Sequence, residues 1–506
     1  MGSRAEHAGS LRDDGRAAAS APPAPPSGRF DDVAALRAAI DAAGFTAQAV
    51  RRALHADADM LTSPQDVVVN ERRVAAAPPA LATLIRLFVL ELPVTADDAD
   101  RALAGPGAHA LLDLGLAAEE DGLLRRTVRL VPHDHLLVAS DKPGAGGANQ
   151  VAGVQRPSAM LAALTVRRPV AAALDVATGC GIQALLISPH AERVVATDVN
   201  ERALAFAEFN AALNGVENVE FRAGSFIEPA AGERFELVAC NPPYVISPET
   251  ALVFRDSGLP GDTVSARLVA ELPEHLEEGA FGTILVSWIA GEDTTLRPRA
   301  WLEGHGCDAW IFHTATDDPL KAAAQWNRPL DVTPDELARH IDDWLAYYAR
   351  LGIQAIAYGA IVLRRRSGGG NWTRAVELPA SRPAAASDHL LRLFAAQELL
   401  AATADDALLD LRLTLVERAY VDRTSRVESG TWTQTSAAIR LAEGIELGVN
   451  LDRYGSALAG ALDGSEPLRA RVPALAAELG LPESELAAFA ARLLHPLVEH
   501  GFAVER

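Results

Sequence analysis

The chemically most informative side chains lie in one tetrapeptide, Asn241-Pro242-Pro243-Tyr244, directly after an apolar run that predicts a strand over 235–240. A planar NH2 group, in an amide or on a base, is a poor nucleophile because its lone pair is delocalised. The Asn241 carboxamide oxygen can accept one N–H of such a group, and the Pro242 carbonyl, fixed by two rigid rings, can accept the other. Tyr244 can stack on the planar group. This pattern predicts methyl transfer from a sulfonium to a planar nitrogen, in which positioning and electrostatics replace a strong base.

A second group of residues has the pattern of a nucleoside-binding turn. Thr178, Gly179 and Gly181 follow an apolar run, and the two glycines let the backbone turn tightly and approach a ligand closely. Asp198, after the next apolar run, can accept hydrogen bonds from both hydroxyls of a ribose. The glycine spacing alone is also compatible with a nicotinamide dinucleotide. However, Asp175 just before the turn would repel a pyrophosphate and suit a cationic amino-acid group, which favours S-adenosylmethionine (SAM) over NAD.

These side chains need a scaffold that brings strand ends together. From about residue 170 the sequence alternates strand-like apolar runs with helical patterns, which predicts a parallel sheet covered by helices on both faces. Open parallel sheets bind ligands at the carboxyl ends of their strands, where both motifs lie. The fold class that we expect is α/β, with a Rossmann-like seven-stranded core. The expected strands cover 171–176, 193–197, 219–222, 235–240, 282–289, 307–313 and 356–365, and the expected helices include 183–187 and 202–213.

With these motifs the chain resembles the class I SAM-dependent methyltransferases. Within them it is similar to the NPPY branch, which contains the release-factor glutamine N5-methyltransferases and the N6-adenine methyltransferases. The resemblance covers roughly residues 150–300. It implies SAM as the cofactor and Asn241, Pro242 and Tyr244 as the catalytic residues. The cofactor-binding residues that it implies are Asp175, Thr178, Gly179, Gly181, Asp198, Val199, Ser225, Phe226 and Asn241.

The resemblance also implies where the substrate binds. Arg255 and Asp256 begin a segment that lies where glutamine methyltransferases carry a glycine-rich substrate loop, so we expect both to bind substrate together with Pro243 and Tyr244. The chain departs from the family after the third strand, where an acidic residue usually contacts adenine. Ser225 stands near that place, and we expect its hydroxyl oxygen to accept the adenine amino group.

The regions on either side of the resemblance are large and do not match the small amino-terminal domain of the release-factor enzymes. We expect winged-helix-like ends in both flanking domains, with a plain helical packing domain as the alternative for the N-terminal one. The expected organisation is a disordered leader over 1–29, a helical N-terminal domain over 30–128, the methyltransferase domain over 129–370 with a helical insertion over 315–354, and a mainly helical C-terminal domain over 371–506.

The charge of the chain bears on its substrate. Its 46 Lys and Arg residues against 67 Asp and Glu residues give a net charge of −21. Such a chain is a poor general binder of polyanions, because neutralising phosphates needs clustered Lys and Arg. We therefore expect the acceptor to be a protein or peptide amide, and the resemblance implies an amide of the glutamine type. N-methylation of a nucleobase in rRNA, tRNA or DNA is an alternative, since the short basic run Arg364-Arg365-Arg366 could contact nucleic acid. A non-catalytic SAM-binding module is a second alternative.

The cysteines, the histidines and the apolar runs bear on the cellular compartment, on metal binding and on membrane contact. The three cysteines are far apart in the sequence, which argues against a disulfide framework and fits a reducing cytoplasm. His133 and His135 have no visible set of partner ligands, so we expect no metal. No apolar run approaches the ~20 residues that a membrane span needs, so we expect a cytoplasmic protein that does not contact a membrane.

Overall fold

The computed structural model describes residues 24–55, 64–142, 147–327, 332–378 and 385–506. Most of the expected leader, residues 1–23, lies outside the described residues. The rest of it is packed: Pro26 is buried, and the Ser27 N–H donates a hydrogen bond of 3.2 Å to the Leu114 carbonyl. The leader boundary that we placed at residue 29 is therefore wrong, because the segment just before it docks on the end of a helix.

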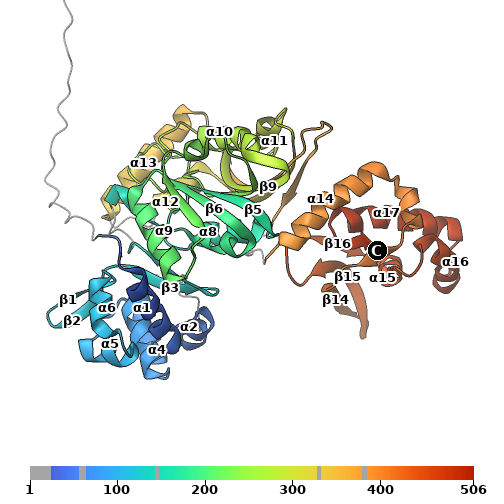
Figure 1. Ribbon diagram of the computed structural model, residues 1–506. Coiled ribbons are helices and arrows are strands. Elements are labelled where there is room, and N and C mark those ends of the chain that lie inside the picture. Colours follow the sequence, from blue (N-terminus) through green and yellow to red (C-terminus); the bar gives the residue numbers. More distant parts are fainter. Residues whose placement is uncertain (1–23, 56–63, 143–146, 328–331, 379–384) are drawn as a thin grey trace, which may run out of the picture.

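The N-terminal domain is a group of short helices followed by a β-hairpin (Figure 1). Thr46 and Thr95 each begin a helix by accepting a hydrogen bond from a backbone N–H of its first turn. Leu36, Ile85 and Phe88 are fully buried in its core. The helices are α1 (Phe30–Ala42), α2 (Ala47–Leu54), α3 (Pro64–Val74), α4 (Pro79–Leu84), η2 (Ile85–Val89), α5 (Ala96–Ala102) and α6 (Gly107–Asp113), and the hairpin pairs β1 (Ala117–Glu120) with β2 (Leu123–Arg126).

An eight-stranded sheet forms the centre of the molecule, in the order β12-β10-β11-β9-β8-β5-β6-β7. Neighbouring strands are parallel, except that β11 is antiparallel to both β9 and β10. The mostly parallel sheet with helices confirms the expected α/β class. Its strands are β5 (Val170–Val176), β6 (Ala191–Asp198), β7 (Val219–Ala223), β8 (Phe235–Cys240), β9 (Leu276–Ile289), β10 (Cys307–Asp317), β11 (Ile356–Arg365) and β12 (Thr373–Glu377).

The edge strand β12 corrects both the expected seven strands and the expected boundary at residue 370. It pairs in parallel with β10, from Ala309↔Thr373 onward. The buried carboxylate of Asp308 accepts a hydrogen bond of 3.3 Å from the Trp372 N–H, which anchors the start of the strand. The sequence did not indicate this strand because Val376 is its one large apolar residue, so it has no apolar run.

Short helices connect the strands, and a second hairpin joins the N-terminal domain to the central one (Figure 1). The hairpin follows directly on β2, and its second strand lies against α9. These elements are β3 (Arg129–His133), β4 (Leu136–Ser140), η3 (Gly147–Asn149), α7 (Arg156–Leu164), α8 (Ile182–Ile187), η4 (Ser188–His190), α9 (Glu201–Leu213), η5 (Glu228–Ala230), α10 (Thr263–Glu271), η6 (Leu272–His275) and α11 (Leu296–Leu302).

Two asparagines of α9 and its C-cap bind β4 as a neighbouring strand would. The Asn214 carboxamide accepts from the Leu137 N–H at 2.9 Å and donates to the Leu137 carbonyl at 2.8 Å. Asn210 does the same with Ala139, at 2.8 and 2.9 Å. Asn210 also donates a hydrogen bond of 2.9 Å to the carbonyl of Cys180, in the loop after β5. One buried side chain thus connects the hairpin with that loop.

Two helices, α12 (Pro319–Asn327) and α13 (Pro334–Arg350), lie between β10 and β11, within the range expected for an insertion. Thr333 and Glu336 form a capping box that begins α13. The buried rings of Trp344 and Tyr348 share a small core with Val245 and Ile246, which directly follow the tetrapeptide. The insertion is therefore packed against the chain segment after Tyr244.

The C-terminal domain contains more strand than we expected. Helices make up most of its regular structure, as predicted, but it also holds a three-stranded antiparallel sheet of β14, β15 and β16 that the sequence analysis did not predict; its many exposed polar positions hide the usual strand pattern. The elements are α14 (Ser387–Ala402), η7 (Asp405–Asp410), β13 (Leu413–Leu415), β14 (Ala419–Glu428), β15 (Thr431–Leu441), β16 (Gly448–Leu451), α15 (Arg453–Gly460), α16 (Leu468–Leu479), α17 (Glu483–Glu499) and β17 (Ala503–Glu505).

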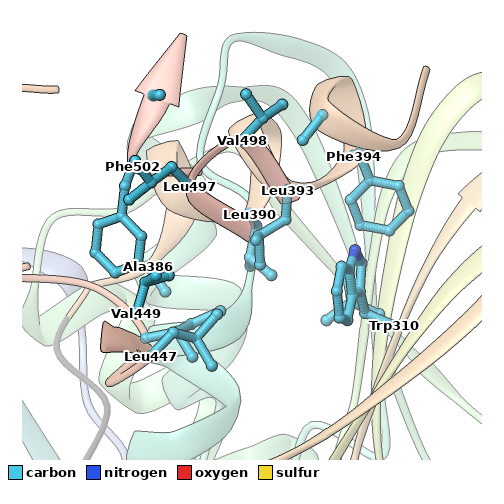
Figure 2. Close-up of a cluster of buried hydrophobic side chains, with 14 of the residues drawn as sticks. Trp310, Ala386, Leu390, Leu393, Phe394, Leu447, Val449, Leu497, Val498 and Phe502 are labelled. Atoms are coloured by element: carbon cyan, nitrogen blue, oxygen red, sulfur yellow. The ribbon is translucent and has the colours of Figure 1, made fainter. Parts of the chain in front are cut away.

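Helix α14 joins this domain to the central sheet. Figure 2 shows Leu390 and Leu393 of α14 beside Leu497, and Phe394 facing Trp310 of the central sheet. Phe394 also packs edge-to-face on Phe281 of β9, with ring centroids 5.2 Å apart. The two domains therefore share one continuous hydrophobic core.

Candidate active site

A cavity of about 360 Å³ opens at the carboxyl ends of β5, β6 and β8, a volume typical of small-molecule sites. Both sequence motifs contribute to it, as expected when parallel strands end at one edge of a sheet. The predicted residues that line it are Thr178, Gly179, Asp198, Val199, Ser225, Phe226, Asn241, Pro242, Pro243, Tyr244, Arg255 and Asp256. Asp175 and Gly181 are not among the lining residues.

The turn after β5 adopts a backbone conformation that few residues tolerate. Ala177, Gly179 and Gly181 all have positive φ, of 58°, 55° and 83°. A Cβ on Gly181 would lie 2.9 Å from the Cβ of Ala207 in α9, so glycine is needed there for close packing of the turn on the helix. Gly181 therefore shapes the turn by its contact with α9, without lining the cavity.

Asp175 braces this turn from within the protein. Its Oδ2 accepts hydrogen bonds from the Thr178 hydroxyl at 2.5 Å and from the Ala184 N–H at 3.0 Å. Burial raises the pKa of the Asp175 carboxyl to about 7. We predicted that this carboxylate would contact a cationic ligand group. In the structure its Oδ2 is instead bonded to the loop and to the start of α8, and the residue does not line the cavity.

Asp198 ends β6 at the cavity wall. Its Oδ2 accepts from the Gly179 N–H and its Oδ1 from the Asn200 N–H, each at 2.9 Å. Burial raises the pKa of the Asp198 carboxyl above its ordinary value, and the backbone hydrogen bonds oppose that shift. The two N–H donors fix the direction of the carboxylate, and each oxygen keeps a lone pair for another donor.

The tetrapeptide follows β8 and turns sharply. Within the described part of the chain, no hydrogen bond engages the half-buried carboxamide of Asn241. The Pro242 carbonyl accepts the Tyr244 N–H at 2.8 Å, so one of its two lone pairs is used inside the turn. The Ser287 hydroxyl of β9 donates to the Tyr244 carbonyl and holds the turn against the sheet. Asn241 thus presents an uncommitted carbonyl oxygen and NH2 group at the cavity.

The arginine that we predicted to bind substrate is engaged inside its own loop. Arg255 is only 3% exposed, and its guanidinium bonds both oxygens of Asp256, at 2.7 and 3.0 Å. It also bonds Glu249 at 2.5 Å and the Trp326 carbonyl at 3.2 Å, and it lies over the ring of Trp344. Both Arg255 and Asp256 line the cavity, but their opposite charges pair with each other. The pair fixes the loop, and its binding of substrate stays a prediction.

Sequence reasoning missed two contributions to the cavity. Trp326 reaches it from α12, and the segment 150–152 also lines it. The loop that carries Val253 is bonded to the segment before 150, because the Val253 N–H donates to the Ala148 carbonyl at 3.0 Å. Trp326 is the one aromatic residue of its helix, but no sequence signal shows which way it faces.

The described residues contain no group of three or more His, Cys, Asp or Glu side chains that could hold a metal ion. They also contain no helix whose length and hydropathy would let it cross a bilayer.

Comparison with known families divides the chain into three parts. Residues 152–280 match the family described as "Methyltransferase small domain". Residues 42–127 match "Domain of unknown function (DUF7059)", and residues 392–505 match "Domain of unknown function (DUF7782)". The methyltransferase match covers both motifs and every strand from β5 to β8.

Relatives in sequence are similar over this central part. The release factor glutamine methyltransferase of Xylella fastidiosa is 36% identical over 151 residues, which are 28% of this chain and 50% of that protein. That of Geobacter sulfurreducens is 32% identical, covering 26% and 50%. The ribosomal protein uL3 glutamine methyltransferase of Bradyrhizobium diazoefficiens is 29% identical, covering 29% and 50%. The chain thus spans about half the length of these relatives.

Solved structures match more weakly. The YcgJ protein of Bacillus subtilis is 17% identical, with 42% of this chain and 99% of that chain covered, at a TM-score of 0.29. The relationship therefore rests on the sequence matches. The central part of this chain matches the methyltransferase small domain and is similar in sequence to release factor glutamine methyltransferases.

Proposed function

We propose that the protein is a SAM-dependent N-methyltransferase whose acceptor is the side-chain amide of a glutamine in another protein. The printed names of the relatives support the reaction: they are glutamine methyltransferases of release factors and of ribosomal protein uL3. The site supports it as well, because an uncommitted carboxamide, Asn241, lies in the same cavity as the carboxylate of Asp198.

The residues around the cavity fit SAM. Asp198 would accept hydrogen bonds from the ribose hydroxyls with the lone pairs that its backbone partners leave free. Ala177 and Gly179, both at positive φ, expose backbone at the cavity that would face the methionine portion. Ser225 and Phe226 would contact the adenine. When bound, SAM supplies an electrophilic methyl group.

The tetrapeptide would position the acceptor nitrogen. The Asn241 carbonyl oxygen would accept one N–H of the glutamine amide, and the free lone pair of the Pro242 carbonyl would accept the other. Burial raises the pKa of the Tyr244 phenol well above its ordinary value, so Tyr244 stays neutral and offers a ring surface instead of a base. Catalysis would then come from orientation and electrostatics.

One observation favours a protein over a nucleic acid as the acceptor: the described residues that line the cavity offer no free cation. Among the described lining residues, Arg255 is the only one with a positive charge, and Asp256 and Glu249 neutralise it. Phosphates of a nucleic acid would find no partner there. The basic run 364–366 was the basis for the nucleic-acid alternative. Two of its arginines, Arg364 and Arg366, form ion pairs with the buried Asp308.

The test is methyl transfer from labelled SAM to purified acceptors. A bacterial release factor and ribosomal protein uL3 serve as protein acceptors; total tRNA, total rRNA and duplex DNA serve as nucleic-acid acceptors. We expect label on one protein, located by mass spectrometry on a glutamine, and none with Asn241→Ala. Label on a nucleic acid, or SAM binding without transfer to any acceptor, would refute the proposal.

We also propose that this activity resides in the cytoplasm. Cys180, Cys240 and Cys307 are free and buried, which suits a reducing compartment. Fractionation of cells that express the tagged chain tests this proposal.

A further inference from the structure

The insertion supplies a residue to the cavity that the tetrapeptide does not predict. Trp326, near the end of α12, lines the cavity, and its ring contacts that of Tyr244. The two ring centroids are 6.5 Å apart and the ring planes stand at 82°. The two rings form a right-angled aromatic corner beside the tetrapeptide. Such a corner suits an aliphatic stem that ends in a planar group, because both rings offer apolar surface.

Trp326 is held in place at two points. Its indole N–H donates a hydrogen bond of 3.2 Å to the hydroxyl of Tyr358 in β11. Its main-chain carbonyl accepts a hydrogen bond of 3.2 Å from the guanidinium of Arg255. The ring therefore has a fixed orientation before any acceptor arrives, which is what a specificity residue needs.

The insertion also fixes the loop that follows the tetrapeptide. The Tyr348 hydroxyl donates to the Ile246 carbonyl, and the Tyr347 hydroxyl accepts from the Gly261 N–H, each at 2.9 Å. Two side chains of α13 thus bind the backbone on both sides of the Arg255 pair. The corner, its helices and the loop form one connected unit.

We propose that Trp326 determines acceptor specificity by packing against the two methylene groups of the acceptor glutamine while Asn241 and Pro242 hold its amide. This inference rests on the proposed function. The corner contains no free charge, so a lysine or glutamate at the same place would lose its hydration without gaining a partner. A neutral amide on an aliphatic stem loses little hydration free energy at this place. This difference in desolvation cost selects glutamine over lysine and glutamate.

The experiment compares Trp326→Ala and Trp326→Phe with Gln325→Ala, an exposed neighbour on the same helix. The probe is whichever protein, release factor or uL3, the wild type methylates. We expect Trp326→Ala to raise KM about tenfold, as the loss of part of the apolar contact with two methylenes predicts. Trp326→Phe should raise KM less. The kcat, the SAM dissociation constant by calorimetry and the Gln325→Ala kinetics should change by less than about twofold.

Tyr358→Phe keeps the inference testable if Trp326→Ala fails to fold. It removes only the acceptor of the indole N–H, so KM should rise by a smaller factor while the melting temperature stays close to the wild type. Wild-type KM in folded Trp326→Ala, or in both Trp326→Phe and Tyr358→Phe, overturns the inference and leaves the proposed function standing. A wild type that methylates no protein overturns the proposed function, and the inference with it.

Discussion

At the level of single residues, the proposed methyl transfer depends on one uncharged side chain, Asn241. Replacement by alanine should lower the rate of single-turnover methyl transfer by about 100-fold or more, with little change in SAM affinity. The reason is that its hydrogen bond to the acceptor tightens as the nitrogen becomes pyramidal, so the bond acts mainly in the transition state.

Asn241→Asp is the matched control. It keeps an acceptor oxygen and adds a negative charge, so some turnover on a neutral amide should remain. A wild-type rate in Asn241→Ala would mean that other residues hold the acceptor, and that its nucleophile is an oxygen or a carbon.

Asp198 should carry much of the cofactor affinity. Asp198→Ala should weaken SAM binding by at least ~2 kcal/mol, because a charge-assisted contact with two ribose hydroxyls is lost. Calorimetry measures the change, and thermal melting shows whether the Gly179 turn survives the loss of its acceptor. Unchanged SAM affinity in a folded variant would remove the ribose assignment.

Asp175 makes stability depend on pH. Burial raises the pKa of its carboxyl to about 7 in the folded chain, whereas an unfolded chain titrates near ~3.9. The folded state therefore holds the extra proton between these values, and the group's contribution to stability falls as pH rises from about 4 to about 7, by at most ~4 kcal/mol. Asp175→Asn cannot titrate. Urea unfolding at several pH values should show that the stability of the variant relative to wild type increases over this window; a constant difference would contradict the assignment.

Motif spacing predicted some of these residues well and others poorly. Asn241 and Asp198 reach the cavity because each lies where a buried parallel strand ends, and the carboxyl ends of parallel strands meet at one edge of the sheet. Arg255 and Asp175 turn inward to partners supplied by other segments. Such partners are set by tertiary contacts, which one sequence does not display.

At the level of elements, the loop after the tetrapeptide is secured by a buried ion pair. The side chains of Arg255 and Asp256 are 3% and 0% exposed. Arg255→Met should lower the free energy of unfolding by about 3–5 kcal/mol, because it leaves a buried carboxylate without its partner. The surface pair Arg267–Glu271, 42% and 40% exposed, is the control. Its loss through Arg267→Met should cost less than ~1 kcal/mol. Equal effects in urea unfolding would show that burial does not decide the strength of these pairs.

The elements that the sequence predicted are those with clear periodicity. The runs of β5, β6 and β8 are buried on both faces and stand out as apolar. Strand β12 has alternating burial over a few residues, and β14 is almost fully exposed, so neither has an apolar signature. Their formation depends on partners: β10 for the first and β15 for the second.

At the level of the whole molecule, the methyltransferase domain is held by its neighbours on two sides. Helix α14 shares a core with the central sheet through Phe394, which packs on Phe281 and faces Trp310 (Figure 2). On the other side, β4 is bound by Asn210 and Asn214. The sequence indicated that flanking domains exist, from the change in pattern. It did not indicate these interfaces, because amphipathic periodicity shows that a face is apolar and does not show which distant face covers it.

The double role of Asn210 makes cofactor binding and hairpin opening thermodynamically linked. Its carboxamide bonds both Ala139 and the Cys180 carbonyl of the turn that borders the cavity. A ligand that immobilises the turn should therefore make local opening of the hairpin at β4 less frequent. In deuterium exchange, the amides of 136–140 should exchange more slowly when SAM or its demethylated product is bound. Asn210→Ala should abolish that difference, while Asn214→Ala, which loosens the hairpin without touching the turn, should preserve it. Equal ligand protection in both variants would mean that the hairpin does not sense the occupancy of the cavity.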